Sequence, residues 1–328
     1  MVEKKPLVSI IITTYKGNKN LIRAINSSIN QTYNNVELIV VDDNNPNTEY
    51  REDTEKLMAQ FQGDARIKYI KHDRNKNGAA ARNTGIAHAG GDYITFLDDD
   101  DIYLPNRIER CVKYLLANTD KKGVISSVIF MSSNSFYNVR TAHQSNYYQR
   151  DLLIDNNLLG TGSNIFIKKS CLKTLKGFDV DFLRFQDVEF MLRFLGQYKL
   201  GAINEVLIIK DSGDSNRRPN YSKIKSMAEL FTKKFAMTIS KLNENDQKLF
   251  YRNLYRMLYY AALNSNDKSI IEKSKNEYLQ YDKLTIKDRL YGSYIIRKIA
   301  KYNKKNILNK YSTIISEDNY RLLKEMGR

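Results

Sequence analysis

The sequence predicts an α/β protein with a mainly parallel sheet covered by helices on both faces, followed by a helical C-terminal region. Short apolar runs rich in Val and Ile alternate with segments of helical spacing, and they lack the polar alternation of a sheet with one solvent-exposed face. Beyond about Tyr221 the composition changes to Lys, Tyr, Asn and Leu at helical spacing. The 328 residues also exceed one typical domain. We therefore expect an α/β domain over residues 1–220 and a helical domain over residues 221–328.

The first part of the α/β domain contains strands and helices in regular alternation. Residues 8–15 are a β-branched run of strand length, and residues 21–29 follow with helical spacing. Residues 36–41 form a second strand, a helix is expected near residues 52–61, and residues 67–70 form a third strand. This order is typical of parallel strands joined by crossover helices.

The second part continues with less regular spacing. The predicted elements are, in order, a helix over residues 79–89, a strand over 93–97, a helix over 106–117, strands over 124–131 and 163–167, and a helix that begins near Asp187. The strand over residues 93–97 runs directly into four consecutive aspartates.

The composition excludes several classes of protein. With 42% hydrophobic residues, 15 Gly and 4 Pro, the chain is neither collagen-like nor of low complexity. Its two cysteines, Cys111 and Cys171, lie in apolar segments, so we expect buried free thiols rather than a disulfide scaffold. No stretch reaches the roughly 18–20 apolar residues of a membrane span, and no signal-peptide pattern follows Met1, so we expect a cytoplasmic protein.

The net charge of +16 is concentrated in the C-terminal third, where residues 221–328 hold 23 Lys and Arg against 11 Asp and Glu. Within it, an apolar stripe at helical spacing adjoins a cationic face; the stripe is Tyr291, Tyr294, Ile295, Ile299 and Tyr302, and the face is Arg297, Lys298, Lys301, Lys304 and Lys305. Such a helix can rest on an anionic inner membrane leaflet, or it can dock its stripe on its own domain or on a second subunit of a homo-oligomer. We do not expect nucleic-acid binding, because no recognised nucleic-acid module is present.

Three polar clusters follow predicted strands, namely residues 13–15, 42–43 and 98–101. In an open α/β sheet, ligands bind beyond the carboxyl ends of the strands. The four carboxylates of residues 98–101 would repel one another in an apolar site, so a divalent cation such as Mg²⁺ or Mn²⁺ is their natural partner. The alternative for the same residues is a solvated acidic turn that precedes a helix.

The motifs that carry these clusters occur in a characteristic order. They are residues 8–15, Val41-Asp42-Asp43-Asn44, Asn77-Gly78-Ala79-Ala80-Ala81-Arg82-Asn83, the segment 91–101 with its four aspartates, and Gly177-Phe178-Asp179. Together, over about residues 6–210, they resemble glycosyltransferase family 2. The resemblance implies the GT-A fold and transfer of a sugar from a nucleotide-sugar donor, with UDP-sugar as the leading candidate. Residues 221–328 match no family that we can assign.

The resemblance also assigns donor-binding positions. Thr13, Tyr15 and Asp43 look like the nucleoside-binding residues, with Tyr15 beside the base and Asp43 accepting hydrogen bonds from it. Arg82 looks like a residue that contacts the base or the diphosphate. From the residue type alone, Arg82 can equally pair with an aspartate of the acidic run.

Asp98, Asp99 and Asp100 match the Asp-x-Asp motif of the family, whose members contact the ribose and hold the metal that bridges the donor diphosphate. The resemblance makes Asp100 the first candidate for a ligand of Mn²⁺ or Mg²⁺ and Asp98 the second. Asp99 stands where relatives often have a small or neutral residue, and we assign it to donor binding.

The segment around Phe185-Gln186-Asp187-Val188-Glu189 resembles the one in which the family places its catalytic base. We expect Asp187 to be this base, with Glu189 in reserve, and a direct displacement that inverts the anomeric configuration. The local alternative is a helix N-cap with an acidic first turn.

His72, His88 and His143 lack metal-ligand spacing. Arg217 and Arg218 either close over the diphosphates or form an exposed basic linker.

We expect the acceptor to be a saccharide linked to a lipid diphosphate, a precursor of a bacterial surface glycan, because family habit and the basic C-terminal third agree with a peripheral membrane contact. One alternative is a sugar-nucleotide pyrophosphorylase, but the glycine-rich loop of that class is missing near the first strand. The other is a non-catalytic scaffold with a degenerate donor site, which the presence of Asp43, Asp98, Asp100 and Asp187 disfavours.

Overall fold

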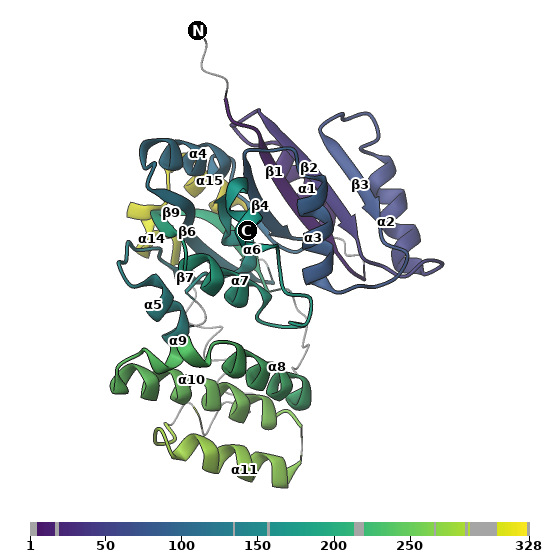
Figure 1. Cartoon of the computed structure of the whole chain (residues 1–328). Coiled ribbons are helices and arrows are strands. Elements are labelled where there is room, and N and C mark those ends of the chain that lie inside the picture. The colour runs from purple at the N-terminus through teal and green to yellow at the C-terminus, as the bar shows by residue number, and fades with distance from the viewer. Residues whose placement is uncertain are drawn as a thin grey trace. The chain divides into compact units, whose positions relative to one another are not determined.

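Figure 1 shows the computed structural model of the chain, which describes residues 5–16, 20–133, 135–155, 158–212, 220–265, 267–285, 288 and 307–326. The chain divides into two compact units. The first comprises Met1–Asn146, Leu159–Gly213 and Ile307–Arg328, and the second comprises Tyr147–Leu158 and Asp214–Asn306. The first unit contains the sheet, and the elements described in the second are helices.

The sheet of the first unit has the strand order β3-β2-β1-β4-β8-β6-β9-β5, and β7 pairs with β6 at the side. The strands are β1 (Val8–Thr14), β2 (Val36–Asp42), β3 (Ile67–Lys71), β4 (Tyr93–Asp98), β5 (Ile102–Tyr103), β6 (Lys121–Ser132), β7 (Ser135–Arg140), β8 (Phe166–Lys168) and β9 (Lys199–Asp211). β3, β2, β1 and β4 run parallel, and so do β6 and β9, whereas β8 joins these two groups in the antiparallel sense. The mainly parallel sheet was predicted correctly, and the antiparallel strands are short or peripheral additions.

The helices of the first unit connect these strands. They are α1 (Leu21–Ile29), α2 (Glu49–Ala59), α3 (Gly78–His88), α4 (Arg107–Ala117), α6 (Leu172–Leu175), α7 (Gln186–Leu195), α14 (Ile307–Lys310) and α15 (Glu317–Met326), with the 3₁₀ turns η1 (Gly162–Asn164), η2 (Lys169–Cys171) and η3 (Ser312–Ile314). The strand predicted over residues 163–167 is shorter in the structure, where η1 precedes β8. The Thr161 side chain caps this 3₁₀ turn by accepting a hydrogen bond from Ser163 N. Both cysteines are buried and unbridged, as predicted.

Helices cover both faces of the sheet because three successive residues of its central strand β1, Ile10, Ile11 and Ile12, are apolar and buried. Ile10 and Ile12 point to one face, where they share a buried cluster with Leu21 and Ile25 of α1. Ile11 points to the other face and packs against Gly85 of α3. Both faces of β1 are buried, which explains why apolar and polar residues do not alternate along it, as the sequence indicated.

The second unit is built around α10 (Glu244–Ala262), which packs against α5 (Tyr148–Ile154), α8 (Tyr221–Lys234) and α11 (Lys268–Leu279); α9 (Ala236–Ser240) follows α8. Arg150 on α5 pairs with Asp246 on α10, with 2.6 Å between Nε and Oδ2. Asn253 donates to the Ile154 carbonyl at 2.6 Å. These contacts group residues 147–158 with the helical unit, although they come from the middle of the predicted α/β domain.

The chain end also departs from the predicted division at residues 220 and 221. Ile315 and Leu323 are buried in a cluster with Val139 and Ile209, so residues 307–326 belong to the first unit. Asn319 Nδ2 also donates to Asn106 Oδ1 at 3.0 Å. The physical reason is that α15 has an apolar face, which a short helix can bury only against another element. The predicted amphipathic helix over residues 291–305 lies outside the described residues, as do Arg217 and Arg218.

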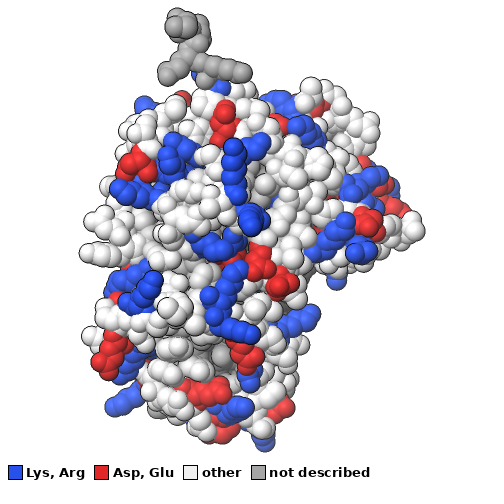
Figure 2. Space-filling model, in the orientation of Figure 1, with Lys and Arg blue, Asp and Glu red and all other residues white. Residues whose placement is uncertain are grey.

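Basic side chains outnumber acidic ones, 53 to 37, in the sequence. On the face drawn in Figure 2 they are distributed widely, and acidic side chains lie among them. The excess of positive charge on this face is therefore spread out rather than gathered in one patch. In the part of the chain that is described, no helix is both long enough and apolar enough to cross a membrane.

We predict that Gly85→Ala lowers the free energy of unfolding by about 2 kcal/mol, because the new Cβ would lie 2.3 Å from Ile11 Cγ2 and force the helix away from the sheet. Urea unfolding measures the change. Gly63→Ala is the matched control, since nothing lies within 4 Å of its Cβ position, and we expect a change of no more than about 0.5 kcal/mol. Equal stability of Gly85→Ala and the parent protein would contradict the close packing of α3 on β1.

Candidate functional site

The three polar clusters predicted to follow strands lie at one edge of the sheet. In the strand register, Thr13 of β1 pairs with both Val41 of β2 and Asp98 of β4, and Thr14 pairs with Asp42. Because these strands are parallel, their carboxyl ends reach the same edge. The sheet therefore brings together residues that are up to about 85 positions apart in sequence, as the hydrogen bond from Thr14 Oγ1 to Asp99 Oδ2 at 2.6 Å illustrates.

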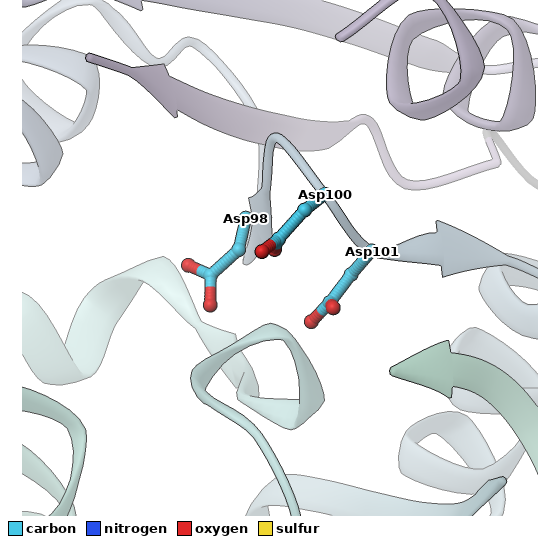
Figure 3. A group of neighbouring side chains, drawn as sticks. All are labelled: Asp98, Asp100 and Asp101. Atoms are coloured by element: carbon cyan, nitrogen blue, oxygen red, sulfur yellow. The ribbon is translucent and has the colours of Figure 1, made fainter. Parts of the chain in front are cut away.

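The acidic run begins at the last residue of β4 and ends just before β5. Asp98, Asp100 and Asp101 each offer a carboxylate oxygen, and these three atoms lie within 4.8 Å of one another. Figure 3 shows the three side chains on the same side of the turn, directed toward a common space. Asp99 instead points toward Thr14, to which it is hydrogen-bonded.

Two basic side chains compensate this negative charge. Lys210, near the end of β9, places Nζ 3.1 Å from Asp101 Oδ1, 3.5 Å from Asp100 Oδ1 and 3.8 Å from Asp98 Oδ2. Arg82 of α3 places Nη2 2.7 Å from Asp98 Oδ1. The structure thus shows the alternative in which Arg82 pairs with an aspartate of the acidic run.

Hydroxyl groups fix the most buried carboxylate. Thr161 Oγ1 and Ser163 Oγ donate to Asp101 Oδ2 at 2.7 and 2.6 Å. Ser163 Oγ also accepts from Asp98 N at 3.0 Å, so one side chain ties the two ends of the acidic run together. The polar side chains of this segment, which also contains Gly160 and Gly162, therefore hold the acidic run in place.

The electrostatic environment differs from one aspartate to the next. Burial raises the pKa of both Asp99 and Asp101 to about 7. Burial also raises the pKa of Asp100. Burial acts on Asp98 too, but the charges of Arg82 and Lys210 outweigh it and lower the pKa of that carboxyl. Desolvation opposes the charged form of Lys210, yet Asp101, Asp98 and Asp100 together raise its pKa.

These residues fit a hard divalent cation. Asp98, Asp100 and Asp101 supply three oxygen ligands in one small space, which suits Mg²⁺ or Mn²⁺. Asp101 Oδ1 is buried, and the Lys210 ammonium 3.1 Å away is its ion-pair partner. The sequence grouped Asp101 with the acidic run, but the family motif assigned only Asp98 and Asp100 as ligands; the available signal for Asp101 was that it continues the carboxylate run directly into the buried residues Ile102 and Tyr103.

The predicted nucleoside residues lie along the same edge. Thr13 is half-buried at the end of β1, and Tyr15 follows it with 44% of its surface exposed. Asp43 is buried just beyond β2, where its Oδ1 is hydrogen-bonded to His72 Nδ1 and to Lys76 N, each at 2.7 Å. Asp43 therefore also organises the loop before α3, and the His72 ring is one of its partners.

Asp187 lies in the first turn of α7, beside Arg82. Both residues lie near Gly162: a Cβ added there would be 3.5 Å from Asp187 Cβ and 3.9 Å from Arg82 Nη2. Gln186 Oε1 accepts from Arg82 Nη1 at 2.8 Å, which links α7 to α3. Phe185, with φ of 61°, is the N-cap residue, so Asp187 is not the helix cap. Burial raises the pKa of Asp187, and the Arg82 charge opposes this rise.

An aromatic cluster beneath the site positions Arg82 and α7. Phe178 stacks on Phe190 with 4.4 Å between ring centroids, and Phe96 of β4 contacts Phe178 edge-on at 5.0 Å. The Arg82 guanidinium lies 5.5 Å from the Phe178 ring. Asn83 holds the Phe178 backbone through two hydrogen bonds of 2.7 and 2.8 Å. The Gly177-Phe178-Asp179 motif therefore supports the site from below.

Glu189, the reserve base, is held in an internal ion pair. It is fully buried, and its two oxygens accept from Arg193 Nε and Nη2 at 2.6 and 2.8 Å. Arg193 also donates to the Gly177 carbonyl at 2.9 Å. Glu189 therefore stabilises α7, and Asp187 is the carboxylate that faces the acidic run.

The chain is similar to known glycosyltransferases. The sequence matches the family described as Glycosyl transferase family 2 over residues 9–176. An uncharacterised glycosyltransferase of Methanocaldococcus jannaschii is 32% identical over 267 residues, which cover 79% of this chain and 87% of that protein. WfgD of Escherichia coli, a UDP-Glc:α-D-GlcNAc-diphosphoundecaprenol β-1,3-glucosyltransferase, is 31% identical over 199 residues, 60% of this chain and 73% of WfgD.

A solved structure has the same fold. The mannosyltransferase PcManGT of Pyrobaculum calidifontis, in complex with GDP-Man and Mn²⁺, superposes with a TM-score of 0.53 over 98% of this chain and 86% of its own. The sequence identity is 16%, so this likeness concerns the fold alone. It confirms the predicted GT-A fold.

We predict that Glu189→Gln lowers the free energy of unfolding by about 3 kcal/mol, because Arg193 would lose its buried anionic partner. The matched control is Glu205→Gln, whose pair with Arg110 is more exposed and should contribute no more than about 1 kcal/mol. Urea unfolding of both variants measures the difference. A Glu189→Gln protein as stable as the control variant would contradict the structural role of this ion pair.

Proposed function

The chain belongs to glycosyltransferase family 2, and on this premise we propose that it transfers one sugar from a nucleotide-sugar donor to a saccharide acceptor with inversion at the anomeric carbon. The observation that carries the proposal is the meeting of Asp98, Asp100, Arg82 and Asp187 at the carboxyl edge of the sheet. Residues suited to hold a metal and a diphosphate therefore lie next to a carboxylate suited to act as a base. The M. jannaschii relative supports the same class of enzyme, because it matches most of this chain.

For the donor, we propose that Asp100 and Asp98 hold Mn²⁺ or Mg²⁺, with Asp101 as a third ligand. The metal, when bound, neutralises charge on the diphosphate as it leaves. The complex of PcManGT with GDP-Man and Mn²⁺ supports a metal in this fold, and the UDP-Glc donor of WfgD supports UDP as the leading nucleotide.

The nucleoside would lie along the ends of β1 and β2. Tyr15 has an exposed ring suited to a base, and Thr13 lies beside it in the strand. Asp43 Oδ2 accepts one hydrogen bond, from Asn75 Nδ2 at 2.8 Å, and a carboxylate oxygen has capacity for a second donor such as a base N–H. Asp99 is assigned to donor binding as well, and its side chain is hydrogen-bonded to Thr14.

The proposed chemistry is a single displacement. Asp187 accepts the proton of the acceptor hydroxyl while that oxygen forms a bond to the anomeric carbon. The bond from the anomeric carbon to the diphosphate oxygen breaks on the opposite face, and the nucleoside diphosphate leaves with the electron pair. Arg82, which contacts Asp98 and Gln186, lies where its charge can stabilise the departing group.

For the acceptor, we propose a saccharide on a lipid diphosphate, a precursor of a bacterial surface glycan. WfgD acts on an acceptor of this kind, according to its name, and the positive charge of residues 221–328 would attract such a lipid or an anionic inner leaflet. The enzyme would then work in the cytoplasm at the membrane surface. The family match removes support from the pyrophosphorylase alternative, and the ordered set of charged residues disfavours a degenerate scaffold.

We predict that Asp100→Ala abolishes metal-dependent binding of nucleotide, whereas Asp187→Asn keeps binding and loses transfer by a factor of about 10² to 10⁴. Calorimetric titration with UDP, GDP and CDP, first with Mn²⁺ and then with excess chelator, measures binding. Asp120→Asn, whose side chain is exposed at the start of β6, is the control for both measurements. Normal transfer by folded Asp187→Asn would remove the base assignment, and no binding of any nucleotide by the parent protein would remove the donor site.

A second prediction concerns pH. A catalytic base must be unprotonated, and burial raises the pKa of Asp187, so activity should fall as pH falls through a value above the ordinary aspartate pKa of about 4. The profile of kcat against pH at saturating donor and metal measures this fall in activity at low pH. A kcat that stays constant down to about pH 4 would contradict the assignment of the half-buried Asp187 as the base.

A further inference from the structure

Lys210 occupies a central position among the three carboxylates of the acidic run. Its Nζ lies 3.1 to 3.8 Å from an oxygen of Asp98, Asp100 and Asp101. The sheet fixes this position, because Ile209 of β9 pairs with Ile102 of β5, and Ile102 directly follows Asp101. Lys210 is therefore held at the acidic run by backbone pairing and not by side-chain contacts alone.

Lys210 also carries most of the local charge compensation. Among the described residues, the ion pairs of Asp100 and Asp101 are formed with Lys210 alone, since Arg82 reaches Asp98 only. Without Lys210 or a substitute, three carboxylates with oxygens within 4.8 Å of one another would face each other at a partly buried edge. Repulsion between such groups is strong at low dielectric constant.

A divalent ion and this ammonium group compete for the same space. A metal bound to the three carboxylates would lie between their oxygens at about 2.0 to 2.2 Å from each. An ammonium nitrogen within 3.8 Å of an oxygen from each carboxylate lies in that region too, and the two cations repel each other. Both cannot occupy these positions at once.

We propose that Lys210 is an internal counter-ion of the acidic run, which a divalent metal must displace in order to bind. Metal binding is then an exchange of cations on Asp98, Asp100 and Asp101 rather than the filling of a free site. The inference rests on the proposed metal-dependent function and adds a residue that sets the affinity for the metal.

The structure gives Lys210 the freedom that such an exchange needs. Its side chain is 24% exposed, so it has a path to solvent. The lysine stem is unbranched and flexible, and its ammonium is well hydrated when it leaves an ion pair. By contrast, Thr161 and Ser163 hold the Asp101 carboxylate in place, and Arg82 holds that of Asp98. The lysine can therefore move while two of the three proposed ligands stay in position.

The test is Mn²⁺ binding by the full chain without nucleotide, measured by titration and detection of free Mn²⁺ by electron paramagnetic resonance. Lys210→Met keeps the length of the side chain and removes its charge, and we expect it to bind Mn²⁺ about tenfold more tightly than the parent protein or better. Lys210→Arg keeps the charge and should bind no more tightly than the parent. Lys199→Met, at the exposed start of the same strand, is the matched control and should leave the affinity unchanged.

The outcomes separate the inference from the function on which it rests. Equal or weaker Mn²⁺ binding by Lys210→Met, with binding by the parent intact, would overturn the exchange while leaving the metal site. Absence of Mn²⁺ binding in both proteins would overturn the metal site and the exchange together. Thermal melting adds a second measurement: Lys210→Met should melt below the parent in chelator, and saturating Mn²⁺ should reduce the difference.

A measurement on the parent protein covers the case in which Lys210→Met does not fold. Reductive methylation followed by mass spectrometry reports how reactive each lysine is. We expect Lys210 to be protected in chelator and to react several-fold faster with saturating Mn²⁺, whereas the exposed Lys199 should not change. Protection of Lys210 that is unaffected by Mn²⁺, under conditions where the metal is bound, would overturn the proposal.

Discussion

The electrostatic cost of four consecutive carboxylates at the edge of a buried sheet is the constraint on which this site depends. A different set of partners compensates the charge of each aspartate. Asp98 pairs with Arg82, Asp99 accepts from Thr14, and Asp101 accepts from two hydroxyls, while Lys210 reaches three of the four. The partners come from β1, α3, β9 and the segment at η1, so the acidic run remains in place only if these elements are packed together.

The fold satisfies this requirement through the order of its strands. β1 and β4 are neighbours, which brings Thr14 to Asp99, and β9 pairs with β5, which brings Lys210 to Asp101. The stacked rings of Phe178 and Phe190 lie under Arg82 and connect α7 to β4 through Phe96. The charged residues are therefore supported by apolar packing on the opposite side, where a displaced ring would move Arg82 and α7 together.

The sequence carries the parts of this arrangement that depend on local pattern. The four parallel strands, their helices and the edge at which the polar clusters meet follow from apolar runs and strand ends, which are properties of neighbouring residues. Lys210 could not be found this way, because it lies more than 100 residues beyond the acidic run in the sequence. Only the pairing of β9 with β5 brings it to the aspartates. The return of residues 307–326 to the first unit was equally hidden, since an amphipathic helix does not specify which surface covers it.

The two carboxylates of α7 show how helix geometry separates functions that the sequence left open. Asp187 and Glu189 are two positions apart, and a helix turns about 200° over that interval, so the two side chains point to nearly opposite sides. Asp187 faces Gly162 and the charge of Arg82, while Glu189 faces Arg193, which accounts for both of its oxygens. A base must reach the acceptor and exchange a proton, and a fully buried carboxylate in a bidentate ion pair does neither. Our proposal that Asp187 rather than Glu189 is the base therefore rests on the direction in which each side chain leaves the helix.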